Sequence, residues 1–261
     1  MTRENRARTA LLVLLVLTIV RVPLAWLMPM LLPDMTVAPE VNYIASIAQS
    51  VLLFALPGWL LMRGTKPEPI GEKRQLDWLL AAIAVSVLAR PALTTLNALW
   101  CGLLSLETSM IPPPQGLVEQ ILQVFALAVV PAVGEELFFR GALLRQLQAE
   151  YGRRWALWLT SLLFALMHGS LGGLPGHLVI GLLLTLLGLH SGGLLAPIAA
   201  HMVYNLLPLR LERGALGTMI LLAVLLAWLI RRVPAGGERP QKREGLMLGL
   251  ILAAMTAQYF L

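Results

Sequence analysis

Long apolar segments dominate this chain and restrict the folds that are open to it. Nine stretches are mostly apolar: 9–32, 43–62, 78–103, 118–139, 154–172, 174–190, 194–209, 215–232 and 245–261. A helix needs about 20 such residues to cross the hydrocarbon layer of a membrane. The last stretch is short, and it either spans the membrane or lies along the interface. The sequence therefore predicts an all-α fold, a polytopic membrane bundle of eight or nine transmembrane helices.

The composition agrees with a membrane protein and argues against a nucleic-acid-binding protein. Only 13% of the 261 residues are charged and 58% are hydrophobic, whereas soluble proteins average roughly 25% charged residues. The net charge is +6, but the Lys and Arg residues cluster between apolar stretches, as in cytoplasmic loops. We therefore expect the lipid bilayer as a partner, and no nucleic acid. Cys101 is the single cysteine, which excludes an intramolecular disulfide and a cysteine-based metal site.

The loops predict one domain and its orientation. The longest polar connections, 63–77 and 231–244, are too short to fold alone, so we interpret 1–261 as a single membrane domain. The basic N-terminus resembles a signal peptide, but Arg21 interrupts the apolar stretch, which favours an uncleaved first helix. Basic loops alternate with the acidic loops 33–42 and 104–117, so the N-terminus is expected to be cytoplasmic. The short loops suggest the inner membrane of a bacterium.

Two glutamates and an arginine lie in one of the apolar stretches, in the segment GEELFFR. Glu136 and Arg140 are four residues apart with the acid first, which is the favourable order for an ion pair on a helix. Glu135 lies about 100° around the helix from Glu136, so it points elsewhere. Ionisable groups within membrane spans usually face the interior of the bundle and mark a functional site.

Two further stretches carry polar residues at helical spacing. Phe164 and His168 are four residues apart in FALMH, and His201 and Asn205 are four apart in HMVYN. A carboxylate beside an imidazole can hold and deprotonate a water molecule that attacks a carbonyl carbon. A second imidazole and an amide N–H can stabilise the resulting oxyanion. Together with Glu135, these residues supply that set, provided that helix tilt or a later start to the 154–172 span brings His168 to the depth of Glu135.

Several alternatives remain open at this point. Buried His and Asn residues can serve only as hydrogen bonds between helices, and the charged residues could form a structural ion pair or a proton relay. His177 and His190 lie near predicted helix ends, where we expect an interfacial position. Arg21 lies two residues before a proline and Arg90 directly before one. We expect both to reach the interface or to bind kinked backbone, with the alternative that one of them lines the site. No HExxH motif, GxSG-like serine or pair of aspartates points to another type of intramembrane protease.

The three motifs together resemble the CAAX prenyl protease type II family, also called the abortive-infection or CPBP family. The resemblance covers 118–210 and is carried by EExxxR (Glu135, Glu136, Arg140), FxxxH (Phe164, His168) and HxxxN (His201, Asn205). It implies a helical bundle around a polar intramembrane cavity, with 118–210 as the catalytic core of an endopeptidase. In this family pattern Glu135 and His168 activate water, and His201 and Asn205 stabilise the oxyanion. Glu136, Arg140 and Phe164 support the site.

The resemblance also implies a substrate and raises the question of a metal. Such an enzyme would cut a membrane-associated or lipid-modified protein or peptide near its C-terminus. Glu135, His168 and His201 could also bind a divalent metal such as zinc, with the fourth position open. The sequence leaves open whether a metal is used at all, and it does not give the oligomeric state. The alternative function is an immunity protein, a scaffold or a proton-coupled transporter that retains the fold.

Overall fold

The described part of the chain is almost entirely helical and contains no strand. The computed structural model describes residues 8–19, 39–63, 72–106, 113–207, 215–234, 248–251 and 255. Its elements are α2 (Pro39–Ser50), η2 (Val51–Ala55), α3 (Leu56–Met62), α4 (Glu72–Leu104), α5 (Leu117–Val124), η3 (Phe125–Val129), α6 (Val130–Glu136), η4 (Leu137–Leu143), α7 (Leu144–Met167), α8 (Leu174–Ser191), α9 (Leu195–Leu206) and α10 (Ala215–Arg231). The η segments are π-helical turns within longer helices. The predicted all-α class is confirmed.

Four of the described helices are long and apolar enough to cross a membrane, so the chain is an integral membrane protein. They are Pro39–Met62, Leu76–Leu104, Leu117–Met167 and Leu174–Ser191, and the shorter apolar helices are Arg8–Ile19 and Leu216–Arg231. Many large apolar side chains on these helices are exposed, as expected of a surface in contact with lipid. The count of eight or nine spans stays a prediction, since most of 20–38 and 245–261 lies outside the described residues.

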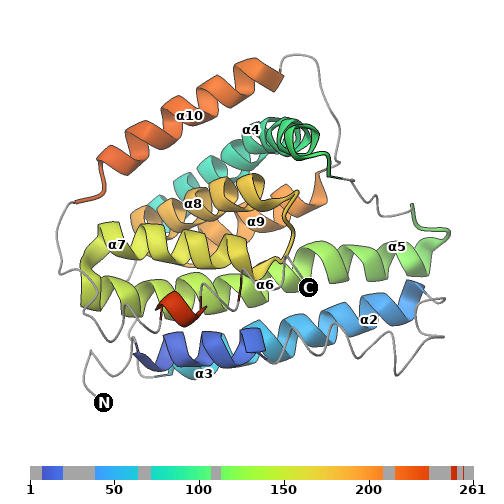
Figure 1. The fold of residues 1–261 in the computed structure, drawn as a ribbon, viewed down its shortest axis with the longest axis horizontal. Coiled ribbons are helices and arrows are strands. Elements are labelled where there is room, and N and C mark those ends of the chain that lie inside the picture. Colours follow the sequence, from blue (N-terminus) through green and yellow to red (C-terminus); the bar gives the residue numbers. More distant parts are fainter. Residues whose placement is uncertain are drawn as a thin grey trace.

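A glycine divides the longest helix into two antiparallel arms. The helix Leu117–Met167 contains two predicted spans, 118–139 and 154–172. Gly152 interrupts it with φ 80° and ψ 170°, a backbone conformation that glycine adopts without a steric penalty. Beyond this residue the chain reverses, and the second part of α7 returns alongside α6 and η4 (Figure 1).

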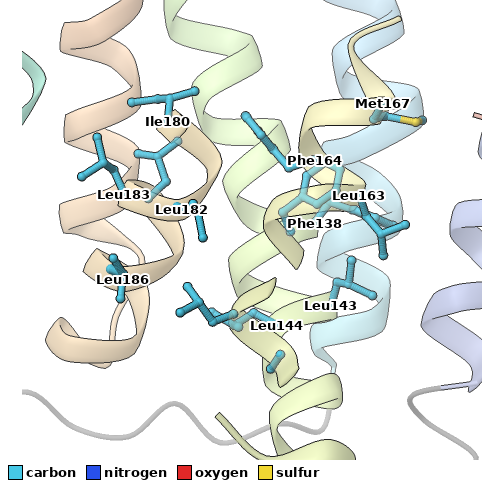
Figure 2. Close-up of a cluster of buried hydrophobic side chains, with 14 of the residues drawn as sticks. Phe138, Leu143, Leu144, Leu163, Phe164, Met167, Ile180, Leu182, Leu183 and Leu186 are labelled. Atoms are coloured by element: carbon cyan, nitrogen blue, oxygen red, sulfur yellow. The ribbon is translucent and has the colours of Figure 1, made fainter. Parts of the chain in front are cut away.

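The helices form layers in which distant parts of the sequence are neighbours. In Figure 1 the α2–α3 helix lies along α5 and α6, α7 lies between α6 and α8, and α10 lies outside α4. Helix α4 packs against α8, α9 and α10. Figure 2 shows Phe138 of η4 beside Leu163 and Phe164 of α7, in a cluster of buried apolar side chains that also includes residues of α8. Ring contacts between Phe138 and Phe139 (5.3 Å) and between Phe139 and Phe164 (5.2 Å) continue this core.

Small residues let the α2–α3 helix approach α6 and η4 almost backbone to backbone. A Cβ atom added at Gly58 of α3 would lie 2.6 Å from the backbone nitrogen of Phe138. A Cβ atom added at Gly134 of α6 would lie 3.1 Å from the carbonyl oxygen of Ser50. Glycine is common where membrane helices cross closely, because association there depends on packing. The two glycines therefore fix the distance between these helices.

We predict that Gly58→Ala destabilises the protein, because its new methyl group would overlap the backbone of η4. Overpacking of this kind costs about 1–3 kcal/mol of the free energy of unfolding. Unfolding by sodium dodecyl sulfate in mixed micelles, followed by tryptophan fluorescence, measures this change. The matched control is Gly102→Ala in α4, where an added Cβ has nothing within 4 Å. Equal stability of the two variants would mean that the close approach at Gly58 is not required.

Candidate active site

A buried carboxylate joins two of the predicted motifs. Oε1 of Glu136 accepts a hydrogen bond from Nη1 of Arg140 at 2.8 Å, and Nδ1 of His201 lies 2.9 Å from the same oxygen. The side chains of Glu136 and Arg140 are fully buried. The predicted pair four residues apart is therefore present. Its extension to His201 means that α6, η4 and α9 meet at one oxygen atom.

The guanidinium of Arg140 extends this cluster to α7 and α8. Nη2 of Arg140 donates to the carbonyl oxygen of Gly181 at 2.9 Å and lies 3.4 Å from Oγ1 of Thr185. The guanidinium carbon lies 4.4 Å from the centre of the Phe164 ring, in a cation–π contact. Ser161 of α7 bonds to the hydroxyl of Thr185 at 3.2 Å. The network thus joins four helices, while Nε of Arg140 and Oε2 of Glu136 have no hydrogen-bond partner among the described residues.

The other glutamate faces a different histidine. Oε2 of Glu135 lies 3.7 Å from Nε2 of His168, and these side chains are 13% and 26% exposed. Nδ1 of His168 lies 2.8 Å from the carbonyl oxygen of Phe164. A carbonyl oxygen only accepts hydrogen bonds, so Nδ1 of His168 carries a hydrogen. A neutral His168 then directs the lone pair of Nε2 toward Glu135, whereas a protonated His168 directs an N–H group toward it.

Glu135 and His168 lie at the same depth because the helix that carries Glu135 is longer than predicted. The predicted span 118–139 continues as a helix to Tyr151, and Gly152 then reverses the chain. Glu135 and His168 are therefore nearly equally far along the chain from this reversal. His168 is the C-terminal cap residue of α7, and the chain then turns at Gly169, which has φ 63°.

Glu135 and His168 line a pocket between the α2–α3 helix and the α5–α7 helix. The pocket has a volume of about 290 Å³. Each of the three π-helical segments found in the described residues contributes to its wall: Phe54 from η2, Ala126 and Leu127 from η3, and Phe139 from η4. Single π-helical turns within α-helices are frequent at functional sites.

Phe164 lies between the two histidine pairs, whereas Asn205 remains apart. The centre of the Phe164 ring is 4.7 Å from that of His168 and 5.8 Å from that of His201. Asn205 lies one turn after His201 on α9 and is partly buried. Within the described part of the chain, no hydrogen bond joins Asn205 to the other site residues. The roles assigned to all of these residues stay predictions.

His177 lies in the first turn of α8, at a helix end as expected, and its ring contacts a motif residue. The ring stacks on that of His168, with centres 4.0 Å apart and planes inclined by 23°. A Cβ atom added at Gly173 would lie 2.6 Å from Cε1 of His177, so a glycine is needed beneath the ring. The short glycine-rich turn between α7 and α8 is the signal that could have identified this neighbour. His190 lies in the last turn of α8 and stacks on Trp78, with centres 6.2 Å apart.

Arg90 of α4 contacts the helix that carries two of the motif residues. Its guanidinium carbon lies 4.7 Å from the centre of the Tyr204 ring, on the helix that carries His201 and Asn205. The aromatic ring therefore holds this arginine in a cation–π contact. Arg21, for which the expectation is the same as for Arg90, lies outside the described residues.

The three candidate metal ligands are not arranged around a common point. His201 directs Nδ1 at Glu136, while His168 faces Glu135. Among the residues that the structure describes, no group of three His, Cys, Asp or Glu side chains could hold a metal ion. A three-ligand zinc site requires all three donor atoms within about 2.0–2.2 Å of the metal. Glu135, His168 and His201 as placed do not fit it.

Comparison with known proteins agrees with the resemblance inferred from the motifs. Residues 117–207 match the family described as type II CAAX prenyl endopeptidase Rce1-like. This confirms the resemblance for the part of the chain that carries all three motifs, and it supports a peptidase in general. An uncharacterized 24.3 kDa protein of Escherichia coli is 29% identical over 181 residues, which are 62% of this chain and 77% of the relative. No solved structure matches the chain.

We predict that Arg140→Met lowers the free energy of unfolding by about 3–5 kcal/mol, since it leaves the Glu136 carboxylate buried without its cation. Unfolding in mixed micelles measures the change. Arg63→Met is the control, because the guanidinium of Arg63 lies 3.7 Å from the ring centre of Trp59 at an exposed helix end. That contact is worth about 0.5–1 kcal/mol. Similar losses in both variants would contradict the importance of the buried pair.

We predict that His177→Ala changes the environment of the His168 ring, because it removes the ring stacked at 4.0 Å. His168 Cε1–H and Cδ2–H chemical shifts, assigned with His168→Gln in detergent micelles, measure the effect. His190→Ala replaces a histidine at the other end of the same helix and should leave these resonances unchanged. His168 resonances that respond equally to both variants would exclude a specific effect of the stack.

Proposed function

We propose that this protein is an intramembrane endopeptidase that hydrolyses a peptide bond of a membrane-associated or lipid-modified protein, near its C-terminus. The observation that carries the proposal is the Glu135–His168 pair, 3.7 Å apart at the wall of a pocket. The match of residues 117–207 to an endopeptidase family supports the same reaction class. The C-terminal cleavage position and the lipid modification follow from the family description alone.

The geometry of the pair suits the activation of water. An ionised Glu135 and the Nε2 lone pair of His168 both accept hydrogen bonds, and one water molecule can donate its two hydrogens to them. The water oxygen then attacks the carbonyl carbon of the scissile bond as its proton passes to Glu135. The C–N bond breaks in the next step, and Glu135 returns the proton to the leaving amine. Every proton in this sequence is accounted for by Glu135, His168 and water.

His201 and Asn205 are proposed to stabilise the oxyanion that forms after attack. Nδ1 of His201 directs its hydrogen at the ionised Glu136, so the ring can donate a second hydrogen from Nε2 only as an imidazolium. The Asn205 amide can donate without any change of protonation. Glu136 and Arg140 thus act through His201, as positioning residues.

The domain and its placement in the membrane complete the proposal. We assign 1–261 to one membrane domain with 118–210 as its catalytic core, a region that nearly coincides with the family match at 117–207. The distribution of basic loops supports a cytoplasmic N-terminus, and the short loops support a bacterial inner membrane. The derived reaction needs no metal, because the side chains supply the base and the donors.

We predict that Glu135→Gln lowers kcat by about 10²–10⁴-fold, the usual contribution of a general base. Mass spectrometry of the C-termini of membrane proteins, in cells that carry only the variant or the wild type, identifies the unprocessed substrate. Cleavage of that substrate by the purified proteins then gives kcat. The matched control is Glu119→Gln, a buried glutamate of the same helix whose Oε2 accepts from the backbone nitrogen of Gln115 at 2.7 Å.

The controls separate chemistry from folding. Glu135→Gln keeps the shape of the side chain, so its unfolding curve should match that of the wild type. A Glu135→Gln protein that cleaves as fast as the wild type would refute the assignment of the base. Identical sets of C-termini with and without Glu135 would refute the proposed function itself.

A further inference from the structure

The pocket that holds Glu135 and His168 has a second polar wall, on α2. Ser46, Gln49 and Ser50 line it and lie on one face of this helix, spaced three and four residues apart. This helix lies outside the region that matches the endopeptidase family, which begins at residue 117. Polar residues within a membrane span are costly and usually functional. The polar residues of this second wall therefore need a functional explanation that the family resemblance does not give.

Gln49 and Ser50 are the residues of this wall whose side chains make no hydrogen bond to a described residue, and Gln49 offers the larger number of donor hydrogens. The hydroxyl of Ser46 donates to the carbonyl oxygen of Asn42 at 2.9 Å, so its hydrogen is used within the helix. The Gln49 side chain makes no hydrogen bond to any residue that the structure describes. Gln123 of α5 differs, because its amide nitrogen donates to the Tyr43 hydroxyl at 3.0 Å across the same pair of helices. The Gln123 amide therefore joins α2 and α5, whereas the Gln49 amide faces the pocket.

The proposed reaction restricts the form of the substrate. In an α-helix each carbonyl oxygen accepts a hydrogen bond from the N–H group four residues further along the chain. The carbonyl oxygen of the scissile bond must instead be free to accept from the groups that stabilise the oxyanion. A substrate segment that reaches Glu135 and His168 must therefore be extended around the scissile bond, without the internal hydrogen bonds of a helix.

An extended peptide within a membrane needs hydrogen-bond partners for its backbone. An unsatisfied amide group in an apolar environment costs several kcal/mol. Most of the remaining pocket wall is apolar, since Phe54, Ala126, Leu127, Pro131, Phe139 and Met167 contribute to it. Glu135 and His168 only accept hydrogen bonds in the reactive state, and they hold the water. A glutamine amide offers two donor hydrogens and one acceptor oxygen, which match the C=O and N–H groups of a peptide.

We propose that Gln49 binds the backbone of the substrate beside the scissile bond and holds this segment extended between α2 and the Glu135–His168 pair. The ligand class is an unfolded stretch of peptide, recognised through its main chain and independent of its side chains. The inference rests on the proposed endopeptidase function and adds a substrate-binding residue on α2. Gln49 stabilises the bound peptide in the ground state and the transition state alike, so its loss appears in KM rather than in kcat.

The test compares Gln49→Leu with Gln123→Leu in detergent solution. The probe is a peptide that spans the cleavage site of the protein whose C-terminus changes with Glu135→Gln. We expect Gln49→Leu to raise KM about tenfold, the effect of one lost hydrogen bond, with kcat within about twofold of the wild type. Gln123→Leu should lower stability through the lost Tyr43 bond and leave KM unchanged in the folded fraction. Ser46→Ala, which alters the same wall without removing a free donor, should leave KM unchanged.

The outcomes separate this inference from the function on which it rests. A normal KM for Gln49→Leu, in a preparation that cleaves the probe and loses activity with Glu135→Gln, overturns the role of Gln49 alone. An equal rise of KM in Ser46→Ala assigns the effect to pocket shape and also overturns it. No change in any C-terminus with Glu135→Gln removes the proposed function and this inference together. Unfolding curves of all variants confirm that each comparison is made between folded proteins.

Discussion

The carboxylate of Glu136 is the contact on which the arrangement of the site depends. A charge in the interior of a membrane protein must be compensated, and Oε1 of Glu136 is compensated twice, by Arg140 at 2.8 Å and His201 at 2.9 Å. Arg140 in turn bonds to the backbone of Gly181 on α8. Removing any one partner leaves a buried charge or donor without its bond. The relative positions of α6, η4, α8 and α9 therefore follow from one electrostatic requirement.

The two adjacent glutamates have different roles: Glu136 is structural, and Glu135 is the proposed base. Because consecutive residues lie about 100° apart on a helix, Glu136 faces the interior and Glu135 faces the pocket. The side chain of Glu136 is fully buried, whereas that of Glu135 is 13% exposed. Full burial suits a permanent ion pair, and access to the pocket suits a base that must exchange protons with water. The rigid cluster around Glu136 thereby holds Glu135 in position.

The sequence predicted what is encoded within single helices and missed what depends on contacts between them. Apolar length predicted helices long enough to cross a membrane, and four-residue spacing predicted the Glu136–Arg140 pair, because both are local properties of a helix. The choice of Glu136 as the partner of His201, the stacking of His177 on His168 and the approach at Gly58 all depend on the packing of separate helices. The α2 wall of the pocket was missed for the same reason, since only the packing of α2 against the α5–α7 helix makes its polar face part of the pocket.

The π-helical segments have a consequence for comparing this chain with its relatives. A π-helical turn holds one residue more than the α-helical turn that it replaces, so each segment shifts the angular position of everything after it by about 100°. The helix from Leu117 to Tyr151 contains two of them, η3 and η4. A helical wheel drawn from its first residue therefore assigns the wrong side to residues beyond Val129. A homologue that lacks one segment would need a one-residue gap in its alignment to keep the same side chains facing the pocket.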